Sequence, residues 1–217
     1  MRKSRLLGLV LAPFLAFAAP QTSAADTAGD FDYYVLALSW SPTWCALDGK
    51  ERNSAQCRKG AGYGWVLHGL WPQYEEGGWP EHCRSAQRDP SRAETAAMED
   101  IMGTDGAAWY QWKKHGRCSG LTAKTYLGAS RLAYEAVKKP EVLQQLDRDV
   151  RLPAKVIEEA FLKANPQLSA DMVTVTCKSR RVQEVRVCLT KRLEPRRCGA
   201  ETRRDCSLSD ALLSPIQ

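Results

Sequence analysis

The stretch Trp65-Val66-Leu67-His68-Gly69-Leu70-Trp71-Pro72-Gln73 is the starting point for predicting this fold. Its first three residues form a short apolar run, which indicates a buried strand with His68 at its end. A second stretch, residues 109–118, carries Lys114 and His115. The chain has three histidines, and two of them lie in these stretches. Because imidazole exchanges protons near neutral pH, two histidines and a lysine predict acid–base chemistry at a charged group such as a phosphate.

The second stretch is expected to end a helix that begins near residue 105. On that helix Gln111, Lys114 and His115 are spaced to project from one face. Tyr110 and Trp112 fall on other faces, where we expect them to pack. The negative end of the helix dipole favours a protonated imidazole, so we expect a raised pKa for His115.

The remaining pattern mixes strands and helices. The region 43–64 and the region 74–90 read as loops, and residues 193–217 are poorly patterned. Strands are expected at 31–38, 172–177 and 182–190, the last two as a hairpin, and further helices at 91–102 (with a Ser91–Glu94 capping box), 123–139 (capped by Thr122) and 153–164. This mixture predicts an α+β fold.

The first residues have the features of a secretory signal peptide. Arg2, Lys3 and Arg5 precede an apolar run, residues 6–18, and small residues lie just before a cleavage position near Ala24. The alternative is a membrane anchor, but the run is shorter than the roughly 20 residues of a spanning helix. We therefore expect residues 1–24 to be removed and residues 25–217 to form a single domain without membrane attachment, periplasmic or secreted.

Charge and cysteine content narrow the class of protein further. The formal net charge of +6 falls to near +3 without the three basic residues of the signal peptide, which is compatible with a polyanionic substrate. Eight cysteines in an exported chain indicate disulfides, although the pattern leaves 105 pairings open. A zinc site is the competing interpretation, and the lack of any Cys-x-x-Cys pair argues against it.

The wording of both histidine stretches resembles the T2-type ribonucleases. His68-Gly69-Leu70-Trp71-Pro72 is similar to the first active-site segment of that family, and Trp112-Lys113-Lys114-His115-Gly116-Arg117-Cys118 to the second. Residues 31–45 resemble the first strand of the family and the turn after it. The resemblance covers nearly the whole mature chain and is closest to the bacterial, periplasmic branch. It implies a central antiparallel sheet with flanking helices, stapled by disulfides.

The resemblance also implies roles for individual residues. His68 would donate a proton to the leaving oxygen, and His115 would take the proton of the 2′-hydroxyl. Lys114 would stabilise the transition state. Trp71 would stack on a nucleobase, and Gln73 falls where some members have an acid that contacts the base.

Two positions depart from the usual form of the second segment. Gln111 replaces a glutamate, and Tyr110 replaces a histidine whose phosphate contact its hydroxyl can retain. Gln111 carries no charge and exchanges no proton, so we expect a weaker enzyme or one with a less acidic optimum. His82 precedes Cys83 in a loop and is expected to be structural or exposed.

The resemblance implies a disulfide pairing as well. The loop after the first active-site segment would be tied to the end of the second, which would fix the two histidines relative to each other. The implied pairs are Cys45–Cys57, Cys83–Cys118, Cys177–Cys206 and Cys188–Cys198.

These expectations lead to one main hypothesis and two alternatives. The main one is a monomeric endoribonuclease of low specificity that needs no metal or cofactor and cleaves single-stranded RNA to 2′,3′-cyclic phosphates, then 3′-phosphates. The first alternative is a catalytically weakened relative that acts as an RNA-binding or toxin-like interaction protein, as Gln111 would allow. The second is an unrelated disulfide-stabilised binding domain, which leaves both histidine stretches unexplained.

Overall fold

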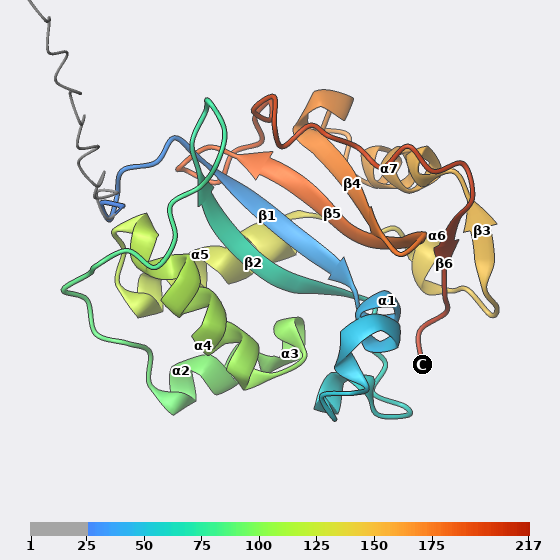
Figure 1. The fold of residues 1–217 in the computed structure, drawn as a ribbon, viewed down its shortest axis with the longest axis horizontal. Helices are drawn as coiled ribbons and strands as arrows, with labels where there is room; N and C mark the ends of the chain where they lie inside the picture. Colours follow the sequence, from blue (N-terminus) through green and yellow to red (C-terminus); the bar gives the residue numbers. More distant parts are fainter. Residues whose placement is uncertain (1–25) are drawn as a thin grey trace, which may run out of the picture.

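The computed structural model describes residues 26–217, and the predicted signal peptide lies outside them. Its centre is a six-stranded sheet with the order β2-β1-β5-β6-β3, in which β4 also pairs with β5 (Figure 1). Every pairing is antiparallel except the short parallel contact of β5 with β6. The strands are β1 (Tyr33–Trp40), β2 (Trp65–Gln73), β3 (Val150–Leu152), β4 (Val173–Lys178), β5 (Arg181–Leu189) and β6 (Ala211–Leu213).

Helices flank this sheet, as the α+β prediction requires. Figure 1 shows α2 to α5 gathered on the β1–β2 side and α7 beside β4. The helices are α1 (Ser41–Trp44), α2 (Arg92–Ala96), α3 (Glu99–Met102), α4 (Asp105–Lys114), α5 (Ala123–Ala136), α6 (Glu141–Gln144) and α7 (Ala154–Ala164). Within residues 26–217 no helix is both long and apolar enough to cross a bilayer.

Strand β2 differs from its prediction in a way that matters for the site. It does not stop at His68 but continues to Gln73. The pairing with β1 shifts between Ala37 and Leu38, so that Ala37 lies opposite Gly69 and Leu38 opposite Leu67. His68 is therefore the extra residue of a β-bulge, and it is exposed between buried neighbours. A bulge re-aims the side chain that it carries, and here it turns an imidazole out of the sheet.

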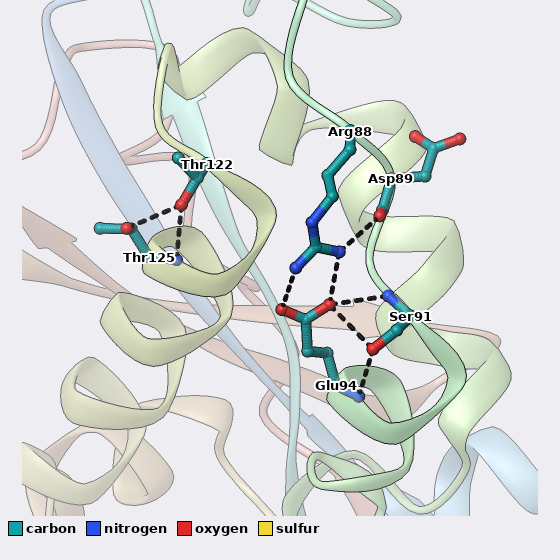
Figure 2. Close-up of polar contacts among 6 residues, drawn as sticks. All are labelled: Arg88, Asp89, Ser91, Glu94, Thr122 and Thr125. Carbon is teal, nitrogen blue, oxygen red and sulfur yellow. Dashed lines mark hydrogen bonds and ion pairs between the residues drawn. The ribbon is translucent and has the colours of Figure 1, made fainter.

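Several local predictions are confirmed by the helix ends. Ser91 accepts a hydrogen bond from the Glu94 amide, and the Glu94 carboxylate accepts one from the Ser91 amide, completing the predicted capping box (Figure 2). Arg88 adds a bidentate ion pair to Glu94 at 2.7 and 2.8 Å. Thr122 caps α5 through the amide of Thr125.

Other local predictions are wrong. The predicted loop 43–64 contains the end of α1 and two further helical turns, Cys45–Gly49 and Ala55–Cys57. The helix expected at 91–102 is divided into α2 and α3. Strands β3 and β6 were not expected, because each has three residues and is defined by its partner rather than by a pattern of its own.

The four disulfides join the pairs that the resemblance implies. They are Cys45–Cys57, Cys83–Cys118, Cys177–Cys206 and Cys188–Cys198. Cys83–Cys118 connects the loop after β2 to the turn after α4. Asp89 reinforces the same connection by accepting hydrogen bonds from the Trp112 indole at 2.9 Å and from Arg117 at 2.6 Å. The two histidine stretches are thus held together by covalent and polar links.

Candidate active site

A cleft of about 570 Å³ opens between β2, α4 and the C-terminal loop. Both candidate histidines line it, one from the bulge of β2 and the other from the end of α4. All seven residues singled out from the sequence share this cleft: His68, Trp71, Gln73, Tyr110, Gln111, Lys114 and His115.

The indole of Trp71 packs against both imidazoles. Its ring centroid is 5.0 Å from that of His68 and 5.4 Å from that of His115. The indole N–H donates a hydrogen bond of 2.7 Å to the side-chain oxygen of buried Gln111. Gln111 therefore fixes the orientation of the aromatic ring that packs against both histidines.

Gly69 is required at this point because no space exists for a side chain. A Cβ there would lie 2.3 Å from the Gln111 oxygen and 2.3 Å from the Trp71 indole nitrogen. Real Cβ contacts are not this short, so any larger residue would displace the Trp71–Gln111 pair. This explains why glycine follows His68.

The imidazole of His68 is held by a hydrogen bond to a buried carboxylate. Its Nδ1 lies 2.5 Å from Oε1 of Glu184, which is buried on the central strand β5. Arg186 donates two further hydrogen bonds to Oε2 of Glu184, at 2.9 and 2.8 Å. Burial alone would raise the pKa of the Glu184 carboxyl, but the hydrogen bond and charge of His68 together with Arg186 lower it to about 2. Glu184 is therefore ionised at neutral pH.

His115, unlike the exposed His68, is buried. It is 6 % exposed, and its Nδ1 has no hydrogen-bond partner among residues 26–217. Burial, followed by the positive charges of Lys114 and His68, lowers the pKa of His115 to about 3. The raised pKa expected from the helix dipole is wrong, because desolvation of a buried imidazolium outweighs a dipole effect of about 1 kcal/mol.

This pKa predicts how stability depends on pH. Below the ordinary value of 6.5, the unfolded chain binds a proton at His115 that the folded chain does not bind, until the pH approaches 3. The free energy of unfolding should therefore fall by about 2 kcal/mol between pH 7 and pH 5 from this group. Urea unfolding at both pH values measures it. His115→Leu should flatten this part of the profile, and an equal fall in that variant would contradict the assignment.

Lys114 approaches the cleft from the last turn of α4. Its ammonium lies 3.3 Å from Oε2 of Glu81, which also accepts a 3.1 Å hydrogen bond from the indole of Trp79. The hydrogen bond from Trp79 and the contact with Lys114 lower the pKa of Glu81 despite some desolvation. The contact between Lys114 and Glu81 is partly solvent-exposed, so an anion in the cleft can compete for the ammonium.

Gln73 and Tyr110 occupy different positions around the cleft. Gln73 is buried, and its amide donates to the carbonyl of Pro72 at 2.8 Å. Tyr110 is 54 % exposed, so the expectation that it packs is wrong. It stands at the rim between this cleft and a second one of about 370 Å³, and the two clefts share His68, Tyr110 and Gln111.

The sequence did not point to Glu184 and Arg186. Both face the cleft side of β5, two residues apart. The available signal was a pair of opposite charges at i and i+2 in a strand whose other residues from Val182 on are mostly apolar. Within the described part of the chain, no group of three or more His, Cys, Asp or Glu side chains is arranged to hold a metal.

Comparison with known protein sequences finds ribonucleases. The chain is 42 % identical over 120 residues to a ribonuclease of Aeromonas hydrophila, covering 54 % of this chain and 50 % of that protein. It is 27 % identical over 217 residues to ribonuclease I of Escherichia coli, covering 81 % and 80 %. The chain spans about half the length of several other curated relatives it matches.

Comparison with solved structures shows a shared fold, and the family follows from the match to a family model. The crystal structure of RNase NT in complex with 5′-AMP superimposes with a TM-score of 0.62 at 20 % identity, covering 87 % of this chain and all of that one. The family model described as "Ribonuclease T2 family" matches residues 31–198. With both histidine stretches inside the matched region, the chain belongs to the ribonuclease T2 family.

Proposed function

We propose that this protein is an exported endoribonuclease that cleaves single-stranded RNA by transesterification without a metal. The observation that carries the proposal is the contrast between the two histidines around Trp71. One is buried, beside a lysine, and has a pKa of about 3. The other projects from a bulge and contacts an ionised carboxylate. A buried, neutral imidazole suits the role of base, and an exposed imidazole with a fixed hydrogen-bond partner suits the role of acid.

The reaction follows from these assignments. Neutral His115 takes the proton of a ribose 2′-hydroxyl, and the 2′-oxygen forms a bond to the adjacent phosphorus. The bond from phosphorus to the 5′-oxygen breaks, and His68 gives that oxygen a proton. The products are a 2′,3′-cyclic phosphate and a 5′-hydroxyl. In the slower second step, water opens the cyclic phosphate to a 3′-phosphate with the histidine roles reversed.

The surrounding side chains suit a single-stranded polyanion. Lys114 supplies positive charge where a phosphoryl oxygen would carry it, and Trp71 offers an aromatic face for a splayed base. The two clefts that meet at His68 and Tyr110 provide room for the nucleotides on each side of the broken bond. Four disulfides and the predicted signal peptide support export to an oxidising compartment.

The test is cleavage of a defined single-stranded RNA by the mature, disulfide-bonded protein in excess chelator, with both new ends identified. We expect cyclic-phosphate and 5′-hydroxyl ends. Chelator-sensitive cleavage, or ends of another kind, would contradict the mechanism. Binding of RNA without cleavage would instead support the alternative of an interaction protein that has lost turnover.

Gln111→Glu tests what the missing carboxylate does. A glutamate can still accept the Trp71 N–H bond, but its charge lies close to His115 and favours the protonated imidazole. We expect the acid limb of the kcat/KM profile to move to higher pH, by about one unit. The wild type, with Gln111, would then have its acid limb at lower pH than an enzyme with glutamate at this position, because the low pKa of His115 keeps the base neutral in mild acid. This is the reverse of the less acidic optimum expected for the wild type from the sequence. An unchanged rate and pH profile would show that Gln111 acts only through Trp71.

A further inference from the structure

We propose that Glu184 is a positioning residue for His68, so that strand β5 supplies a carboxylate to the acid of the site. Its role is to hold Nδ1 of the imidazole and thereby direct Nε2 toward the leaving oxygen of the RNA. The inference rests on the proposed function, because it concerns the residue assigned there as the acid.

The contact between Glu184 and His68 joins a buried carboxylate to an imidazole that lines the cleft. Glu184 is 1 % exposed, whereas the side chain of His68 is 43 % exposed. A carboxylate is costly to bury unless its charge and lone pairs are satisfied. Here His68 and Arg186 satisfy both oxygens, so removal of either partner would leave the charge incompletely compensated.

The orientation of this carboxylate is fixed by its other contacts. Oε2 accepts both hydrogen bonds from Arg186, which leaves Oε1 for His68 and for a longer contact of 3.3 Å from the Ser39 hydroxyl. In the sheet, Glu184 pairs with Ser39 of β1 on one side and with Thr176 of β4 on the other. A group on a central strand with locked partners is held more accurately than one on a loop.

This arrangement selects the proton positions on the imidazole. Oε1 of an ionised carboxylate accepts only, so Nδ1 must carry the proton of the shared hydrogen bond. Nε2 is then the nitrogen that exchanges protons with the substrate. The hydrogen bond from Nδ1 to Oε1 keeps the ring in one orientation while Nε2 passes a proton to the leaving oxygen.

The side chain on α4 does not compete for this role. Within residues 26–217 the Gln111 side chain makes no hydrogen bond to either histidine, and its oxygen accepts the N–H of the Trp71 indole. Gln111 positions the aromatic ring, and Glu184 positions the acid. The site therefore contains an ionised carboxylate in contact with a histidine although the helix has none at residue 111.

Glu184→Gln provides the test because Arg186 dictates how the new amide is oriented. The two N–H groups of Arg186 require an oxygen, so the amide NH₂ is left facing Nδ1 of His68. Nδ1 must then accept, and its proton moves to Nε2. Nitrogen-15 NMR of the imidazole should show Nδ1 protonated in the wild type and unprotonated in the variant. We expect kcat for RNA cleavage to fall about 100-fold with a much smaller change in KM.

Two comparisons separate positioning from a structural role. Glu194→Gln changes an exposed carboxylate paired with Arg192 and should leave the tautomer and kcat unchanged. In a His68→Ala background, Glu184→Gln should cause no further loss of kcat, because its effect passes through the imidazole.

An unchanged Nδ1 signal in Glu184→Gln, or an equal loss of kcat in the His68→Ala background, would overturn the proposal. If the wild type cleaves no RNA, the proposed function fails on its own. The tautomer measurement then still decides whether Glu184 controls His68.

Discussion

His115→Ala is expected to reduce kcat/KM for RNA cleavage by at least about 10³-fold, since general base catalysis contributes effects of this size. The imidazole is the group whose pKa, about 3, keeps it neutral at the pH where the 2′-hydroxyl must be deprotonated. Lys114 cannot replace it, because an ammonium has no lone pair with which to accept a proton. The measurement is the initial rate on a defined single-stranded RNA at several pH values.

His82→Asn is the matched control for this prediction. His82 is exposed and has a φ of 54°, a left-handed conformation that asparagine tolerates better than most residues. Its backbone N–H donates to the Lys114 carbonyl at 2.8 Å, and this bond does not depend on the side chain. The control should retain the wild-type rate. Substantial residual activity in His115→Ala, or an equal loss in His82→Asn, would remove His115 from its role as the base.

Local features were predictable where the information lies within a few residues. The capping box of Ser91 and Glu94 and the Thr122 cap depend on side chains that contact amides three residues away. The hairpin between β4 and β5 is likewise local, with Ser179 and Arg180 both at positive φ as a two-residue turn requires. The resemblance placed the candidate site, and all seven of its residues line one cleft.

The errors share a physical cause, which is dependence on distant parts of the chain. The bulge at His68 exists only because β1 pairs with β2 out of step at that point. The low pKa of His115 comes from burial beneath other elements, which a helix considered alone does not reveal. Glu184 follows His68 by 116 residues, so their contact depends on strand β1 lying between β2 and β5.

Removal of the Cys83–Cys118 disulfide, as the double variant Cys83→Ala/Cys118→Ala, is expected to impair both stability and catalysis. The bond closes a separation of 35 residues, for which the chain-entropy relation gives a loss of about 4 kcal/mol. Cys118 lies one turn after His115, and Cys83 follows His82, whose amide is bonded to Lys114. Loosening this link lets the end of α4 move relative to β2, and proximity catalysis is sensitive to shifts of about 1 Å.

Cys177→Ala/Cys206→Ala is the matched comparison because that bond closes a similar separation of 29 residues. It joins β4 to the C-terminal segment and touches neither α4 nor β2, so we expect a loss of stability close to 4 kcal/mol by the same relation with kcat retained. Urea unfolding gives both stabilities, and kcat is measured where each variant is fully folded. Equal losses of kcat in the two double variants would mean that general loosening reduces activity. A selective loss in Cys83→Ala/Cys118→Ala would show that this covalent link holds His115 in position relative to His68.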